Sequence, residues 1–298
     1  LFAAISGSSA ATVATVGKMS IPELRKRKYP EKILLGSLAG SGTLGLLIPP
    51  SIILIIYGVA VQESIAKLFI AGIIPGIMIA LIFMSYVIIW SLINKKIMPK
   101  ILEEYSFIDK IKRSKQLLPV IILILAVIGS IYTGIATATE AASLGVLGAL
   151  ILSYFQKSLT VETFKSSLLG ATKTSCMIAF ILAGSTFLSL AMGFTGLPRN
   201  LALWIQNMEL SPYVLIFVLM IFYIILGMFL DGISAVVLTM AIIEPMIRQA
   251  GFDMIWFGIF LVIVVEMAQI TPPVGFNLFV LQGMANKDMG YIAKSAFP

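Results

Sequence analysis

The segment LGLLIPPSI (44–52) decides how this chain folds, because MAQITPPVG (267–275) repeats its proline pair much later in the sequence. Of the five prolines up to Pro75, four recur at one constant offset, in a chain with 13 prolines: Pro22, Pro49, Pro50 and Pro75 return as Pro245, Pro272, Pro273 and Pro298. Proline breaks helices, and in lipid each freed backbone group needs a partner within the protein. The repeated spacing therefore predicts one broken-helix unit built twice, which is typical of secondary transporters.

The amino-acid composition places the chain in a membrane. Of its 298 residues 59% are hydrophobic and 12% are charged, and the mean hydropathy is +1.03, whereas soluble domains carry about 25% charged residues. Apolar runs long enough to cross a bilayer, roughly 20 residues each, occur at 33–58, 68–93, 117–135, 138–155, 168–192 and 255–283, and a further run at 212–247 is interrupted at Gly227 to Gly232. We therefore predict an all-α integral membrane protein.

The basic residues predict the orientation of the chain. Of the 21 Lys and Arg, which give a formal net charge of +7, we place 18 on one side of the membrane, most of them in loops 18–32 and 94–116. The positive-inside rule makes these loops cytoplasmic. Because the charge follows topology, it does not support a nucleic-acid partner.

Missing residue types argue against an enzyme. The chain has no histidine to activate a serine nucleophile or to carry a proton, and its single cysteine, Cys176, excludes a disulfide framework and predicts a buried apolar thiol. Only Asp231 lies within an apolar core, so an aspartyl intramembrane protease lacks its second carboxylate. The glycine-rich segment GSGTLG (40–45) lacks the lysine of a phosphate-binding loop.

The repeat predicts an inverted architecture. Five crossings lie between the two copies, and an odd number turns the second copy upside down, as in alternating-access carriers. We predict four regions: residues 1–58 hold the first hairpin and broken helix of a transport domain, 59–211 hold mainly scaffold helices, 212–283 hold the second hairpin and broken helix, and 284–298 begin a final scaffold segment. Both ends of the sequence are expected to be cut, with further helices beyond them.

Small residues interrupt one apolar segment in each copy. AISGSSAATVATVG (4–17) and GMFLDGISAVVLT (227–239) are predicted to be re-entrant hairpins, and their tip residues Ser8 and Asp231 precede Pro49 and Pro272 by the same distance along the chain. Oxygen atoms beside broken helices suit a hard monovalent cation. One predicted cage joins Ser6, Ser8 and Ser9 to the unwound stretch 45–50, and the mirrored set is Asp231, Ser234, Ala268, Thr271 and Pro273. The alternative for such small residues is close helix packing.

The acidic residues of the apolar segments have different predicted roles. An ionised Asp231 at mid-bilayer would cost roughly 2.5–3.5 kcal/mol, so it should lie beside a cation or stay protonated. Glu140, in the Thr-rich segment 133–143, is predicted to organise a turn. For Glu244 and Glu266 two alternatives remain open: each lies at a membrane interface, or the two pair with each other.

Five segments together resemble the large membrane subunit of a tripartite ATP-independent periplasmic (TRAP) transporter: AAISGSSAATVATVG (3–17), GTLGLLIPPS (42–51), IATATEAASLGVLGAL (135–150), LGMFLDG (226–232) and AQITPPVGFNLFVLQG (268–283). The resemblance implies sodium-driven uptake of an acidic organic solute, such as a C4-dicarboxylate or sialic acid, across a bacterial inner membrane. It also implies a periplasmic binding protein, a small four-helix membrane subunit, separate or fused, and an elevator movement of hairpins and broken helices.

The resemblance also implies two sodium sites and a substrate site. The first sodium site would use Ser6 and Ser8 with backbone oxygens of Gly45, Ile48 and Pro50, and the second would use the Asp231 region with Gly227, Ala268, Thr271 and Pro273. The solute would bind between the tips, near Ser9, Ser51, Ser234 and Asn277. Ser9 stands where many relatives have glycine, and Gly232 where many have serine.

Two alternative functions remain open at this point. One is a sodium/dicarboxylate symporter of similar hairpin architecture that needs no binding protein. The other is a proton-coupled carrier that uses Asp231. A passive channel would need a continuous polar pore, for which the sequence offers few residues.

Overall fold

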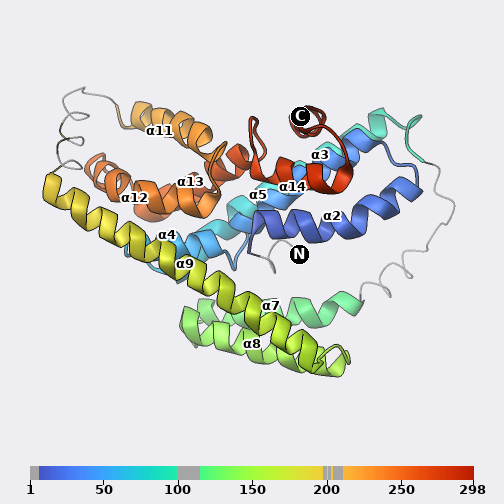
Figure 1. The fold of residues 1–298 in the computed structure, drawn as a ribbon, viewed down its shortest axis with the longest axis horizontal. Helices are drawn as coiled ribbons and strands as arrows, with labels where there is room; N and C mark the ends of the chain where they lie inside the picture. The colour runs from blue at the N-terminus through green and yellow to red at the C-terminus, as the bar shows by residue number, and fades with distance from the viewer. Residues whose placement is uncertain (1–6, 100–114, 197–199, 201–202, 204–210) are drawn as a thin grey trace. The chain divides into compact units, whose positions relative to one another are not determined.

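The computed structural model describes residues 7–99, 115–196, 200, 203 and 211–298, which form helices and turns with no strand among them. This confirms the all-α prediction. The chain divides into two compact units, one formed by Lys100–Ala183 and the other by Phe2–Pro99 together with Gly184–Pro298. Each unit is described by itself (Figure 1).

The unit within Lys100–Ala183 is built on a helical hairpin. After the short 3-10 helix η1 (Lys115–Leu117), α7 (Leu118–Tyr132) packs against α8 (Ala138–Phe155), and α9 (Val161–Thr195) follows. The Glu140 carboxylate accepts hydrogen bonds from the Thr137 backbone N–H and hydroxyl, both at 2.8 Å, while the Thr137 hydroxyl accepts one from the Glu140 N–H at 3.3 Å. This reciprocal capping box begins α8 and confirms that Glu140 organises the turn.

The larger unit contains all the described residues predicted to form a site. Its helices are α2 (Ser9–Lys26), α3 (Glu31–Leu47), α4 (Ile52–Ala60), α5 (Ile65–Ile93), the last part of α9, α11 (Pro212–Gly227), α12 (Gly232–Gln249), α13 (Met254–Gln269), α14 (Phe276–Ala285) and α15 (Met289–Ala296).

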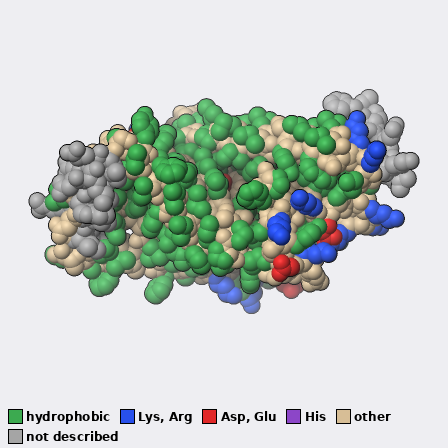
Figure 2. Space-filling view, turned by 90° about the horizontal axis from the view of Figure 1, so that it is seen from above, with side chains coloured by type: hydrophobic (Ala, Val, Ile, Leu, Met, Phe, Trp, Pro, Cys, Tyr) green, Lys and Arg blue, Asp and Glu red, His purple; other side chains and the backbone are tan. Residues whose placement is uncertain are grey.

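Four described helices are long and apolar enough to cross a membrane, namely α5, α8, α9 and α12, and the bent pair α3–α4 counts as a fifth when taken as one span. Large apolar side chains point outward along α5, including Ile74 and Ile93. Apolar side chains cover much of the face shown in Figure 2, and the Lys and Arg side chains on it are few. Such a surface is stable against lipid, so the chain is a multi-pass membrane protein.

Each proline pair separates two helices, as predicted. Pro49-Pro50 lies between α3 and α4, which are bent by 41°, and Pro272-Pro273 lies between α13 and α14; both Pro-Pro peptide bonds are cis. Two adjacent prolines remove two donors and push each preceding residue out of helical geometry.

Single prolines do not break helices here, contrary to expectation. Pro22, Pro75 and Pro245 lie inside α2, α5 and α12. A lone proline removes one intrahelical bond, which neighbouring helices and local adjustment can compensate in a membrane protein. The repeat of proline spacing is therefore a repeat of helix breaks only at the paired positions.

Two further predictions need correction. The loop predicted over 18–32 is mostly helix, because α2 continues to Lys26 and α3 begins at Glu31; the apolar Ile21 and an Arg27–Glu23 bond of 2.7 Å support the extra turns. Cys176 is exposed on α9 rather than buried, as an apolar side chain on a lipid-facing helix can be. Most of the predicted cytoplasmic loop 94–116 lies outside the described residues.

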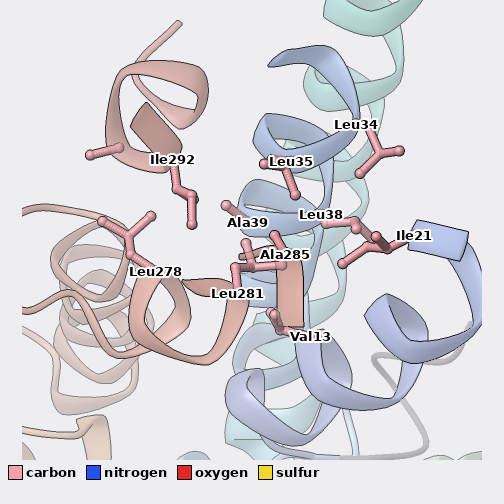
Figure 3. Packing of buried hydrophobic residues seen from close by; sticks show 11 residues of the cluster. Val13, Ile21, Leu34, Leu35, Leu38, Ala39, Leu278, Leu281, Ala285 and Ile292 are labelled. Atoms are coloured by element: carbon pink, nitrogen blue, oxygen red, sulfur yellow. The ribbon is translucent and has the colours of Figure 1, made fainter. Parts of the chain in front are cut away.

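In the larger unit, helices of the N-terminal half (α2–α5) pack against helices of the C-terminal half (α11–α15). Helix α2 packs against α3 and α14, whereas α12 packs against α13 and α4. A hydrophobic core fixes the first of these arrangements, with Val13 and Ile21 of α2, Leu35 and Leu38 of α3, and Leu281 of α14 among its members (Figure 3). Helix α2 is therefore held in part by α14, and α12 in part by α4.

Close packing of α3 against α15 gives a stability prediction. A Cβ atom on Gly36 would collide with the backbone carbonyl of Ser295, which cannot turn aside as a side chain can. Gly36→Ala should therefore lower the free energy of unfolding by about 1–3 kcal/mol, measured by thermal or denaturant unfolding in detergent. Gly40→Ala is the matched control on the same helix, since its Cβ would lie 3.6 Å from the Phe83 ring. Equal stability of the two variants would contradict the packing.

Candidate functional site

The tip of the first half lies against the break between α3 and α4. Gly7 has a φ of +58°, and Ser8 caps α2 by accepting a hydrogen bond from the Ala11 N–H at 3.5 Å. A Cβ on Gly45 would lie 3.1 Å from the Ser8 carbonyl oxygen, and one on Gly7 would lie 3.4 Å from the Pro50 carbonyl oxygen. The structure thus brings together Ser8, Gly45 and Pro50 of the first predicted cation site.

The other residues predicted near the first break, Ile48, Ser51 and Ser6, are not shown in contact with Ser8. Ile48 ends α3, and its side chain lies against Gly76 of α5. Ser51 is fully buried, donates its hydroxyl hydrogen to the Leu46 carbonyl and accepts from the Leu54 N–H at 3.4 Å. Ser51 therefore bridges the helix break. Ser6 lies outside the described residues.

The tip of the second half is the turn between α11 and α12. Asp231 caps α12 by accepting hydrogen bonds from the N–H groups of Ile233 (3.1 Å) and Ser234 (3.2 Å) and from the Ser234 hydroxyl (2.5 Å). The sequence folds locally in this way because an aspartate oxygen satisfies helix N–H groups that have no intrahelical partner. Asp231 and Ser234 therefore act as one polar group at the start of α12.

This second tip rests on the break between α13 and α14. A Cβ on Gly227 would lie 2.7 Å from the Ala268 Cβ, and the Met228 carbonyl accepts a hydrogen bond from the Gly275 N–H at 3.2 Å. The Thr271 hydroxyl donates to the Met267 carbonyl at 2.7 Å. Gly227 and Ala268 are thus in contact, while Thr271 and Pro273 lie in the adjoining break.

A polar contact joins the two halves directly. The Asn277 side-chain amide at the start of α14 donates a hydrogen bond of 2.5 Å to the Ser9 hydroxyl at the start of α2. Both residues are buried, and the Asn277 carbonyl oxygen Oδ1 has no hydrogen-bond partner among the described residues. Of the four residues predicted to bind substrate, Ser9 and Asn277 are in contact, Ser234 is bound to Asp231 and Ser51 lies in the first break.

Four helix N-termini meet in this region. Gly7, before α2, contacts Pro50 and Ile52 at the start of α4; Ile53 of α4 contacts Gly232 of α12. The turn before α12 is bonded to Gly275, the N-cap of α14, and α14 returns to α2 through Asn277. These contacts close a ring of α2, α4, α12 and α14. Each N-terminus carries a partial positive charge, and at the start of α12 this charge faces the Asp231 carboxylate.

Sequence reasoning did not foresee the burial of Glu266. Its side chain on α13 is buried, its Oε1 has no hydrogen-bond partner in the described part of the chain, and the carboxyl group lies against the backbone of Leu46 and Leu47 at the end of α3. Glu244 instead accepts a hydrogen bond from Arg248 Nε at 2.9 Å. The alternative in which Glu244 and Glu266 pair with each other is therefore wrong. The signal available from the sequence was a lone glutamate within an apolar run.

The donor atoms define which cation the region suits. Among the described residues no three His, Cys, Asp or Glu side chains gather into a metal site. The oxygens near Gly45 and Gly7 are the Thr12 hydroxyl and the backbone carbonyls of Ser8 and Pro50, beside glycines where a side chain would fill the space. Such a set fits a small hard cation rather than a transition metal.

A helical membrane protein with two broken helices and a central ring of helix N-termini has the architecture of a transport permease rather than of an enzyme. The comparisons with known proteins agree. The family model of the tripartite ATP-independent periplasmic transporter, DctM component, matches residues 1–298. The chain belongs to this family, which is not enzymatic.

Several curated relatives are similar over the whole chain. The C4-dicarboxylate TRAP transporter large permease protein DctM of Pseudomonas aeruginosa is 33% identical over 300 residues, which cover 100% of this chain and 69% of the relative. The 2,3-diketo-L-gulonate TRAP transporter large permease protein YiaN of Escherichia coli is 32% identical, covering 100% and 70%. The sialic acid TRAP transporter permease protein SiaT of Haemophilus influenzae is 31% identical, covering 100% and 48%.

Proposed function

We propose that this chain is the large subunit of a sodium-coupled carrier that takes up an acidic organic solute delivered by a periplasmic binding protein. The ring of four helix N-termini carries this proposal, because it offers positive potential at a place where the described contacting residues include no Lys or Arg. The solutes in the relatives' names, a C4-dicarboxylate, a diketogulonate and sialic acid, are all acids. The particular solute of this chain is an acid of that class.

Two sodium sites would provide the coupling. The first would use oxygens of Ser6, Ser8, Gly45, Ile48 and Pro50, and the second would use oxygens of Gly227, Asp231, Ala268, Thr271 and Pro273. The approach of Ser8 to Gly45 and of Gly227 to Ala268 supports both groupings. Bound sodium would hold each tip on its broken helix and would add positive charge for the solute carboxylate near Ser9 and Asn277.

An inverted repeat and an elevator movement complete the proposed mechanism. Helices that are equivalent in the repeat make exchanged contacts, since α2 pairs with α14 as α12 pairs with α4. Regions 1–58 and 212–283 would then form the moving transport domain, and 59–211 and 284–298 would belong to the scaffold. In the bacterial inner membrane the segments 18–32 and 94–116 would face the cytoplasm.

The family name also implies partners. A TRAP system is tripartite, so we expect a small four-helix membrane subunit and a periplasmic binding protein beside this chain. One relative, the isethionate TRAP transporter permease protein DctMQ of Oleidesulfovibrio alaskensis, is 32% identical over 300 residues, which cover 100% of this chain and 47% of the relative.

Reconstituted uptake tests the proposal against its two alternatives. Proteoliposomes containing the chain with its small subunit should take up labelled solute only when the binding protein is present and sodium is higher outside. Uptake without the binding protein would favour the sodium/dicarboxylate symporter. Uptake that does not depend on sodium but follows a pH gradient would favour the proton-coupled carrier. In that case Ser8→Ala, which removes one proposed sodium ligand, should leave the uptake rate unchanged.

A further inference from the structure

Two arginines at equivalent positions reach across the larger unit. Arg25 lies in the last turn of α2 and Arg248 in the last turn of α12, and the offset between them is the one that separates Pro22 from Pro245. Arg25 Nη2 donates to the carbonyl of Ala285, the last residue of α14, at 2.6 Å. Arg248 Nη2 donates to the carbonyl of Val61, the C-cap of α4, at 3.1 Å. Each arginine therefore binds the end of a half-helix from the other half of the chain.

Each arginine is also fixed by a carboxylate. Arg25 forms an ion pair with Glu31, to which its Nε donates at 3.0 Å. Arg248 Nε donates to Glu244 at 2.9 Å, and its Nη2 lies 3.9 Å from Glu63. The planar fork of a guanidinium allows one side chain to hold a carboxylate and a carbonyl together, which a lysine ammonium does less well. The helix C-termini, which carry partial negative charge, favour a cation at these points.

The same helix pairs are joined at their other ends, at the ring of N-termini. Helices α2 and α14 meet through Ser9 and Asn277, and α12 and α4 meet through Gly232 and Ile53. Each pair therefore runs parallel, with its N-termini at the proposed binding region and its C-termini held by arginine. At 1.5 Å per residue, Arg25 lies about 24 Å along α2 from Ser9.

We infer that Arg25 and Arg248 are positioning residues: Arg25 holds α2 to the end of α14, and Arg248 holds α12 to the end of α4. We call each of these contacts a clasp, and together they keep the four helix N-termini in one arrangement. This inference rests on the proposed function only for the sodium readout of its test. Release of either clasp frees the outer end of a short half-helix, α4 or α14, which then pivots about the ring. The expected effect is weaker cation binding at a distance.

Hydrogen exchange tests the clasp independently of transport. In the full chain in nanodiscs, Arg25→Met should speed amide exchange in α14 and at the tip segment 7–12. The matched control is Arg27→Met, which also removes a positive charge at the end of α2. The ion pair of Arg27 is with Glu23 of the same helix. Glu31→Gln, which leaves the bond to Ala285 in place, should have the smaller effect. Wild-type exchange at the tip in Arg25→Met would overturn the inference.

Sodium titration provides the second readout. The sodium concentration that gives half-maximal thermal stabilisation should rise at least about fivefold in Arg25→Met and in Arg248→Met, whereas Arg27→Met should match the wild type. If Arg25→Met does not fold, Arg25→Lys keeps the charge and should show an intermediate shift. An unchanged midpoint in a folded Arg25 variant would overturn the clasp. A wild type that sodium does not stabilise would overturn the sodium coupling instead, and the exchange experiment would still decide the clasp.

Discussion

Gly45→Val is expected to reduce solute uptake to background. A Cβ atom at this position would lie 2.8 Å from the Thr12 hydroxyl and 3.1 Å from the Ser8 carbonyl oxygen. Valine carries two methyl groups in addition to this Cβ. The tip would be pushed off the break between α3 and α4, which would dismantle the first proposed sodium site. The overpacking should also cost about 1–3 kcal/mol of stability. Uptake into proteoliposomes and thermal unfolding measure the two effects.

Gly40→Val is the control for this substitution. It lies on the same helix, and a Cβ there would lie 3.6 Å from the Phe83 ring, an ordinary contact. It should retain most of the uptake. If Gly45→Val transports as well as Gly40→Val at equal protein levels, the tip does not depend on its approach to α3 and the first site is wrong.

Asp231→Asn should shift the sodium dependence strongly while leaving the fold intact. Asparagine caps a helix as well as aspartate does. Its carbonyl oxygen can accept from the N–H groups of Ile233 and Ser234, and its NH2 group can donate to the Ser234 hydroxyl. Only the negative charge is lost. Removing a charge-assisted interaction costs about 1.5–3 kcal/mol, which corresponds to roughly a 10- to 150-fold rise in the half-saturating sodium concentration.

A second capping aspartate provides the comparison for Asp231. Asp253 accepts a hydrogen bond from the Trp256 N–H at 2.8 Å at the start of α13, outside the ring of N-termini. Asp253→Asn should therefore leave the sodium midpoint unchanged. If the half-saturating sodium concentration is the same in Asp231→Asn and Asp253→Asn, Asp231 is not part of the second cation site.

The sequence predicted the local features of this fold well. Pro49-Pro50 and Pro272-Pro273 break their helices because the effect of two consecutive prolines is confined to the adjoining backbone. Single prolines were misjudged, since α2 and α12 continue through Pro22 and Pro245. The loop over 18–32 was drawn too long because charge alone does not end a helix.

The residue pattern alone predicts few contacts between distant segments; the family resemblance placed Ser9 and Asn277 near one solute, but not the bond between them. The close approach of Ser8 to Gly45 could be anticipated, since the two lie in consecutive segments, but the Asn277–Ser9 bond spans 268 positions. The exposure of a glutamate in an apolar run depends on which face its helix presents, so Glu266 was left open. The partners of Arg25 and Arg248 depend on the packing of α2 against α14 and of α12 against α4, which no local sequence pattern encodes.

The pairing of α2 with α14 has a consequence for biosynthesis. Arg25 and its acceptor Ala285 are 260 positions apart, and a ribosome adds roughly 5–20 residues per second. The N-terminal tip helix therefore waits on the order of tens of seconds in the translocating nascent chain before its partner is made. During that interval its apolar face, including Val13 and Ile21, must be shielded by lipid, by α3 or by the insertion machinery.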